Sequence, residues 1–278
     1  MLLERILGTS CRLLVKQKGK VLPVMMPIIY IDGAPVSMYF LMGLLGCLVS
    51  IILLHIKRRS FNLSRRDIRE IALFSMFGVL TGARLFKIVG LTILHGAEPD
   101  FWTAENWRVV SSGVGVFYGG FLASIGMLVL LAKIRHIDLK NIFNAYAYAT
   151  PTFLMFGRIG CYYAGCCYGI TLSNGERLPV QLIEAGFCAV VLLIFLLVKP
   201  ERRWSEVPLL PVYIAIYAIG RFILEFFRGD ESRGVFWLST SQWISIVLVG
   251  IISVWLYRYK LRPKIEGSIL KNRKETIL

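Results

Sequence analysis

The chain has 278 residues, of which 56% are hydrophobic, and its mean hydropathy is +0.65. This composition is too apolar for an ordinary soluble domain. The formal net charge of +15 suggests nucleic acid as a partner, but most of the charges lie in connections between apolar blocks, which argues against that interpretation.

Long apolar blocks make up most of the chain. A block of about 18 or more apolar residues is typical of a helix that spans a bilayer. Such blocks occupy residues 36–56, 69–93, 114–132, 142–160, 180–198, 207–227 and 236–257. The connections between them are mostly short and leave no room for a soluble domain. The sequence therefore predicts an all-α, polytopic membrane protein with about seven transmembrane helices, in one domain at residues 28–258.

Positive charge alternates along the connections. Lys and Arg are frequent after the first, third and fifth blocks, at Lys57, Arg58, Arg59, Arg65, Arg66, Arg69, Lys133, Arg135, Lys140, Lys199, Arg202 and Arg203. The other connections are poor in Lys and Arg or balanced by acid. This positive-inside bias predicts an N-terminus outside and a basic cytoplasmic tail at residues 259–278. We expect the charges to face anionic membrane lipids, with no nucleic acid as partner.

The N-terminal segment, residues 1–27, does not follow this rule. It is basic, yet the predicted topology places it outside. It is too weakly apolar for a secretory signal peptide. An interfacial amphipathic helix on the outer leaflet is the structure that we expect.

Arginines lie near the ends of two apolar blocks. Arg158 closes the fourth block and Arg221 lies in the C-terminal half of the sixth, so both are predicted toward the outer side of the membrane. Arg221, Glu225 and Arg228 are spaced i, i+4 and i+7, which places them on one face of a helix. Glu225 can hold Arg221 in a bidentate pair while the other arginines bind a phosphodiester. A structural ion-pair network that joins helices is the alternative.

Glycines open the third block, where Gly119 and Gly120 would let a helix or a lipid headgroup approach the backbone. Tyr118 lies beside them, and its hydroxyl belongs either to the site or to the interfacial tyrosine belt. In the second block, Arg84 and Lys87 form a buried pair of like charge. At least one of the two needs an anion or a route to the interface.

The fifth block begins directly after Pro179, in the form of a proline-opened helix. Gln181 and Glu184 share a helix face one turn further on. They are candidates for substrate contacts, and structural polar groups that reach the interface are the alternative.

Three cysteines, Cys161, Cys166 and Cys167, gather in a predicted outer loop. A metal site would want a fourth ligand, and His95 is the only histidine that this topology leaves outside. A catalytic cysteine has no histidine in sequence context to activate it. A disulfide from Cys161 to Cys166 or Cys167, and free structural thiols, both stay open. We expect no metal.

Several motifs together resemble those of one family. The run Gly-Arg-Ile-Gly-x-x-x-x-Gly-x-x-x-Gly at residues 157–169 resembles the signature of bacterial phosphatidylglycerol–prolipoprotein diacylglyceryl transferases. Further similar motifs follow in the same order, namely Gly-Ala-Arg-Leu at 82–85, Gly-Gly at 119–120, Pro-x-Gln-x-x-Glu at 179–184, Arg-x-x-x-Glu-x-x-Arg at 221–228, and Gln242. The resemblance covers roughly residues 27–260.

This resemblance implies a transferase that moves the diacylglyceryl group of phosphatidylglycerol to the lipobox cysteine thiol of a preprolipoprotein signal peptide and releases glycerol 1-phosphate. It implies no cofactor, and a site toward the outer face of the bacterial cytoplasmic (inner) membrane. The residues that it implicates in catalysis are Arg158, Arg221, Glu225 and Tyr118. Those that it implicates in substrate binding are Arg84, Gly119, Gly120, Gly169, Gln181, Glu184 and Arg228.

The chain departs from the family pattern near its candidate site. Tyr118 stands where the family usually has a histidine, Cys161 replaces an asparagine, and Cys166 replaces an acidic residue. The phosphate-handling arginines are kept, whereas the polar groups around them differ. Two other functions stay open: a divergent paralogue that transfers a phosphatidylglycerol-derived group to another acceptor, and a non-enzymatic transporter of anionic lipid.

Overall fold

The computed structural model describes residues 28–31, 34–95, 117–203, 207–229, 234–235 and 237–275. Within these ranges the long elements are all helices: α2 (Met38–Lys57), α3 (Arg65–His95), α5 (Phe117–Arg135), α6 (Leu139–Tyr163), α7 (Val180–Val198), α9 (Leu209–Glu225) and α10 (Thr240–Glu275). Each overlaps one predicted apolar block, so the all-α class is confirmed. The interfacial helix expected at residues 1–27 lies outside the described residues.

The fold is that of a membrane protein. Among the described residues, four stretches are long and apolar enough to cross a bilayer: Met38–Phe61, Arg65–Gly90, Val180–Val198 and Thr240–Arg258. Other helices of the bundle are shorter or more polar; α9, for example, has 17 residues, against about 20 for a usual span. Seven spans and the orientation of the termini stay predictions.

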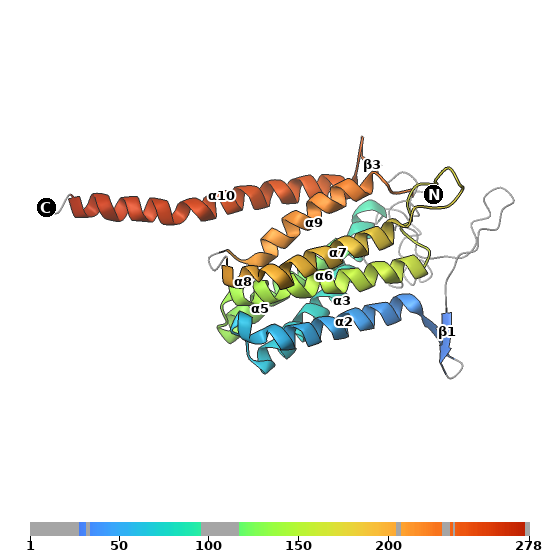
Figure 1. Cartoon of the computed structure of the whole chain (residues 1–278), viewed down its shortest axis with the longest axis horizontal. Coiled ribbons are helices and arrows are strands. Elements are labelled where there is room, and N and C mark those ends of the chain that lie inside the picture. Colours follow the sequence, from blue (N-terminus) through green and yellow to red (C-terminus); the bar gives the residue numbers. More distant parts are fainter. Residues whose placement is uncertain are drawn as a thin grey trace.

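Helix α6 forms the centre of the bundle (Figure 1). It packs against α2 and α7, and also contacts α5 and α9. Residues 144–152 of α6 are all buried, as expected for a helix enclosed on every side. Two further pairs complete the bundle, because α3 packs along α5 and α9 packs along α10.

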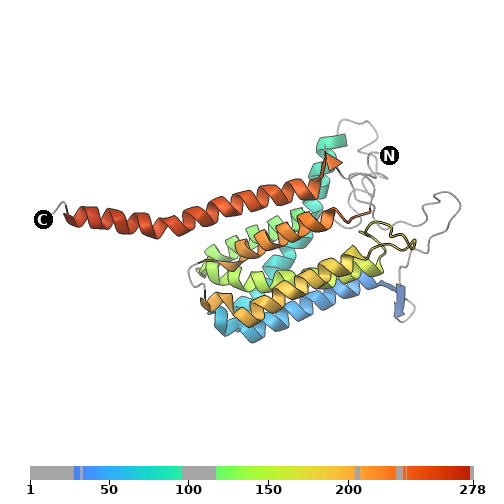
Figure 2. The same cartoon turned by 45° about the horizontal axis from the view of Figure 1, so that its top comes forward.

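The connections that the structure describes lie at two opposite ends of the bundle (Figures 1 and 2). One end, called the basic end, holds the connections after α2, α5 and α7, with the short helices η1 (Arg58–Phe61) and α8 (Pro200–Arg203). There Lys57 Nζ lies 3.0 Å from Glu201 Oε1, and the Tyr148 hydroxyl donates to Glu201 Oε2. The other end, called the site end, holds the loop 164–179 and the last turn of α9.

Two small hairpins lie beside the helices. Strands β1 (Ile28–Ile31) and β2 (Ala34–Ser37) pair antiparallel, with Ile28 opposite Ser37, and lead directly into α2. Strands β3 (Gly234–Val235) and β4 (Leu238–Ser239) form the second hairpin and lead into α10. Helix α10 continues as one helix to Glu275, well past the basic end of the bundle (Figure 1).

Helix starts follow local signals in the sequence. At α10, the Gln242 amide donates to Ser239 Oγ (3.2 Å) and the Ser239 amide donates to Gln242 Oε1 (2.9 Å), which is a capping box. Ser64 and Asp67 form the same reciprocal pair at the start of α3. Gln242 also donates to the Phe222 carbonyl of α9 (3.4 Å). The glutamine that matches the family motif therefore joins the start of α10 to α9.

Helices α3 and α5 approach each other through glycines. A Cβ atom added to Gly78 would lie 2.6 Å from Ser124 Cα, and one added to Gly82 would lie 2.2 Å from Ala123 Cβ. These distances are far below van der Waals contact, so larger residues would push the helices apart. Small residues allow close backbone packing of this kind in membranes.

This packing predicts a contrast between two glycines of the same helix pair. Gly78→Ala should cost about 1–3 kcal/mol of stability, the range for overpacking. Gly126→Ala on α5 should cost nothing measurable, because no atom lies within 4 Å of the added Cβ. Thermal unfolding in detergent micelles measures both. Equal melting temperatures would show that α3 and α5 are not in this close contact.

Candidate functional site

Five charged side chains form a continuous ion-pair chain at the site end. Arg158 Nε of α6 lies 3.0 Å from Glu184 Oε1 of α7, and Arg221 Nη1 of α9 lies 3.2 Å from Glu184 Oε2. Arg221 Nη2 pairs with Glu225 Oε2, and Arg228 Nε lies 4.0 Å from the same oxygen. The candidates Arg158, Arg221, Glu225, Arg228 and Glu184 are thus brought together from three helices and the turn after α9.

The ion-pair chain is buried and rich in arginine. Its five side chains are between 2% and 16% exposed. It holds three guanidinium groups and two carboxylates. Desolvated charges are costly unless paired and hydrogen-bonded. Guanidinium groups held in such a place are suited to binding an anion.

Glu184 is the centre of this arrangement. Besides Arg158 and Arg221, it accepts a hydrogen bond from the Tyr217 hydroxyl (2.6 Å). Sequence reasoning placed Glu184 among substrate contacts or structural polar groups and missed Tyr217. The signal for Tyr217 was its position one helical turn before Arg221, which puts both on one face of α9.

The end of α9 differs from the prediction. The sixth block was expected to continue as a helix to 227, with Arg228 on the same helix face as Arg221. Helix α9 ends at Glu225, and Arg228 instead forms a β-bridge with Gly169. Arg221 also differs, because its two terminal nitrogens contact different glutamates in place of one bidentate pair.

The loop after α6 covers the ion-pair chain because its glycines allow close contact. Ile170 N donates to the Phe227 carbonyl (2.9 Å), and Gly229 N donates to the Tyr168 carbonyl (3.1 Å). A Cβ on Gly169 would lie 2.6 Å from the Leu178 carbonyl oxygen. Packing of the loop against the end of α9 therefore requires glycine at position 169. A contact of Gly169 with substrate stays a prediction.

Gln181 connects this loop to α7. Pro179 precedes the first helical residue of α7, as the sequence predicts. One turn inside, the buried Gln181 donates from Nε2 to the Cys166 carbonyl (2.7 Å). Its Oε1 is buried and accepts no hydrogen bond from the described residues. A buried acceptor without a donor is costly, so this oxygen is suited to a hydroxyl group of a ligand.

An apolar cavity of about 280 Å³ opens beside the ion-pair chain. Its walls come from α3, α5, α6, α9 and α10, and include Phe86, Leu154, Ala218, Arg221 and Leu248. Arg221 of the ion-pair chain thus lines an otherwise hydrocarbon-like space. The combination is suited to a molecule with an anionic head and an apolar tail.

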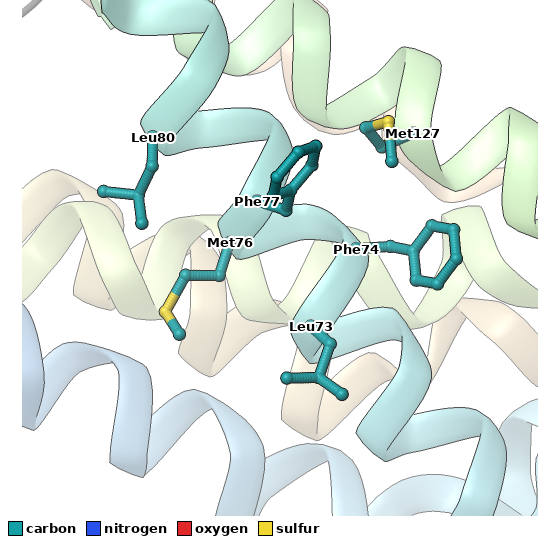
Figure 3. Close-up of a pocket in the computed structure, with 6 residues that line it drawn as sticks. All are labelled: Leu73, Phe74, Met76, Phe77, Leu80 and Met127. Atoms are coloured by element: carbon teal, nitrogen blue, oxygen red, sulfur yellow. The ribbon is translucent and has the colours of Figure 1, made fainter.

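A second hollow, of about 470 Å³, lies on the surface of α3 and has a different character. Figure 3 shows its lining, in which Leu73, Phe74, Met76, Phe77 and Leu80 of α3 are joined by Met127 of α5. All of these side chains are apolar, so none is suited to hydrogen bonds with a lipid headgroup. This surface is suited to contact with lipid hydrocarbon.

The remaining candidates lie on the α3–α5 pair. Arg84 is exposed and Lys87 is buried, so the expectation that both are buried is wrong for Arg84. A Cβ on Gly119 would meet Phe86 Cβ at 2.3 Å, and one on Gly120 would meet the Val79 carbonyl oxygen at 2.9 Å. Helix packing therefore accounts for both glycines. The side chain of Tyr118 lies outside the described residues.

The three loop cysteines form a compact cluster. The Sγ atoms of Cys161, Cys166 and Cys167 all lie within 4.8 Å of one another, and all three are free thiols in this structure. Hydrogen bonds from Cys161 and Cys166, together with the positive charges of Arg228 and Arg158, lower the pKa of the Cys167 thiol. The thiol cluster therefore adjoins the ion-pair chain.

Comparison with known proteins identifies the family. The family described as prolipoprotein diacylglyceryl transferase matches residues 27–258. Because the match covers most of the chain, the chain belongs to this family. The extent agrees with the region over which the sequence motifs were found.

Individual relatives carry consistent names. A phosphatidylglycerol–prolipoprotein diacylglyceryl transferase of Clostridium tetani is 27% identical over 85% of this chain and 99% of its own length. A protein of the same name from Helicobacter pylori is 27% identical over 76% of this chain and 82% of its own length. A Clostridium perfringens protein, named as transferase 2 of this kind, is 32% identical over 69% of this chain and 82% of its own length.

The position of Glu184 predicts a graded loss of stability. Glu184→Gln removes the carboxylate shared by two buried arginines and should cost about 3–5 kcal/mol, the range for breaking a buried ion pair. Tyr217→Phe removes one hydrogen bond to the same carboxylate and should cost about 1.5–3 kcal/mol. Thermal unfolding of both variants in one detergent gives the comparison. A Glu184→Gln variant as stable as the wild-type chain would contradict the shared-carboxylate arrangement.

Proposed function

We propose that this protein transfers the diacylglyceryl group of phosphatidylglycerol to the lipobox cysteine thiol of a preprolipoprotein and releases glycerol 1-phosphate. Family membership makes the protein a transferase. The names of its relatives give both substrates. One observation on this chain carries the proposal: a buried ion-pair chain with three arginines lies beside an apolar cavity that Arg221 lines.

Phosphatidylglycerol fits the ion-pair chain and the apolar cavity in one orientation, with its phosphate at the arginines. Arg158 and Arg221 bind the phosphodiester, since guanidinium groups match the geometry of phosphate oxygens. The acyl chains extend from there into the apolar cavity and the surrounding lipid. Glu184 and Glu225 orient Arg221 from either side, and Gln181 Oε1 accepts a hydrogen bond from a hydroxyl of the glycerol headgroup.

The reaction is a displacement at carbon. The thiol sulfur of the acceptor forms a bond to the glyceryl carbon that carries the phosphate, and the carbon–oxygen bond to phosphate breaks. The electron pair stays on the phosphate oxygen, so negative charge grows where Arg158 and Arg221 lie. Fixed cations at the site of developing charge stabilise the transition state. The thiol proton goes to a base, for which Tyr118 in its phenolate form is the candidate in place of the family's histidine.

The side of the membrane that the site faces follows from the distribution of positive charge along the chain. The basic connections lie at the end of the bundle opposite the last turns of α6 and α9 (Figure 1), and these turns carry Arg158, Arg221 and Glu225. The positive-inside rule places that basic end in the cytoplasm. The site then faces the outer side of the bacterial inner membrane, where the signal peptide of an exported precursor arrives.

Complementation tests the proposed reaction. The wild-type gene should restore growth to a bacterial strain depleted of its own transferase. Arg158→Ala should abolish rescue, because it removes one of the phosphate-binding cations. Arg135→Ala is the matched control, since this arginine lies at the basic end and pairs there with Glu70. It should rescue as the wild type does.

The outcomes of this experiment separate the alternatives. Failure of the wild-type chain to rescue, despite normal amounts in the membrane, would overturn lipoprotein precursors as the acceptor and favour a divergent paralogue. Equal rescue by Arg158→Ala and Arg135→Ala would remove Arg158 from the catalytic machinery. Lipid transport without any diacylglyceryl transfer to a lipobox peptide would favour the non-enzymatic function.

The cavity predicts a dependence on acyl chain length. Ala218 is buried in the cavity wall, so Ala218→Phe should fill space that an acyl chain uses. The variant should show a higher KM for long-chain phosphatidylglycerol and a smaller change for a short-chain analogue. Transfer to a lipobox peptide in detergent measures both. An equal change in KM for the two lipids would show that acyl chains do not enter this cavity.

A further inference from the structure

The turn after α6 holds three thiols in a small volume. Cys161 lies in the last turn of α6, and Cys166 and Cys167 follow in the loop. Their Sγ atoms lie within 4.8 Å of one another. The backbone closes the turn, because Cys166 N donates to the Cys161 carbonyl (3.2 Å). The turn therefore directs three soft ligands toward one point.

The backbone of this turn is strained at a cysteine. Cys167 has a φ of 62°, in the left-handed region that favours glycine. A non-glycine residue in this region costs about 1 kcal/mol or more. Gln181 of α7 holds the preceding carbonyl, that of Cys166, at 2.7 Å. The chain thus has cysteine at position 167, where glycine would be less strained, and the hydrogen bond from Gln181 fixes the backbone just before it.

The separation of the sulfur atoms is close to that in a metal–thiolate site. Zinc–sulfur bonds of about 2.3 Å in tetrahedral geometry place the sulfur atoms about 3.8 Å apart. The thiol cluster reaches this spacing by contracting by about 1 Å or less. Three protein ligands suffice, because a water molecule commonly takes the fourth position of a zinc ion. The missing fourth ligand in the sequence is therefore no obstacle.

The charges around the thiol cluster favour a metal–thiolate group. Three thiolates with one divalent ion carry one negative charge. Arg158 and Arg228 of the adjoining ion-pair chain interact electrostatically with the Cys167 thiol. Cations at such close range favour a negatively charged group.

We infer that Cys161, Cys166 and Cys167 form a binding site for one soft, thiophilic divalent metal ion of the zinc class. The site joins the end of α6 to the loop that covers the ion-pair chain, so a bound ion would fix that loop over Arg228. This binding is independent of the transferase reaction, because the ligands are present whether or not a lipid is bound.

Cobalt provides the probe, since thiolate-bound Co²⁺ absorbs in the near ultraviolet through sulfur-to-metal charge transfer. The full chain, purified in detergent and kept reduced with a phosphine, should take up one equivalent of Co²⁺ with this absorption, and Zn²⁺ should displace it. Cys161→Ser and Cys166→Ser should each abolish the charge-transfer band. Cys47→Ser is the matched control, because Cys47 lies on α2 outside the cluster, and it should bind cobalt as the wild type does.

Two results would overturn the inference. One is a reduced wild-type chain that shows no charge-transfer band. The other is a band that persists in Cys161→Ser. Mass spectrometry of the chain purified without the phosphine then decides what the thiols do, because a disulfide between Cys161 and a neighbour would assign the cluster to redox pairing. Neither result bears on the complementation experiment, so failure of the metal site and failure of the transferase function can be told apart.

Discussion

At the site end, three buried guanidinium groups share two carboxylates, and the arrangement of the helix ends depends on this sharing. Each unpaired charge in such surroundings would cost several kcal/mol. Glu184 contacts Arg158 and Arg221, and Glu225 contacts Arg221 and Arg228. Two carboxylates can pair with three arginines in this way only if the last turns of α6 and α9 and the first turns of α7 lie side by side. The arginines are thereby held in place before any anion arrives, which is the condition for effective electrostatic catalysis.

The loop 164–179 completes this arrangement from outside. Its backbone pairs with the turn after α9 through Gly169 and Gly229, where two main chains touch. The same loop carries Cys166 and Cys167, and Gln181 holds it to α7. The resemblance of the motifs implies that Cys161 and Cys166 stand where the family usually has an asparagine and an acidic residue. It also implies that the arginines of the site are kept while the loop beside them differs.

Sequence patterns predicted the helices and the meeting of the arginines, because long apolar blocks and intramembrane charges each have few physical solutions. They failed where tertiary contacts decide. Arg228 was expected on a helix, but pairing of the loop with the chain after Glu225 ends α9 earlier. Arg84 was expected to be buried, but it lies on the exposed side of α3. Tyr217 was missed although it lies one helical turn before Arg221, because that spacing is noticed only once its partner Glu184 is placed beside it.

The continuation of α10 determines how far the end of the chain stands from the bilayer. The apolar stretch of this helix ends at Arg258, and helix continues to Glu275. At a rise of 1.5 Å per residue, the segment 259–275 extends about 25 Å beyond that stretch. A fluorescent or affinity label fused after Glu275 would therefore be held clear of the apolar stretch by a helical spacer, and would report on the protein from far beyond the site end.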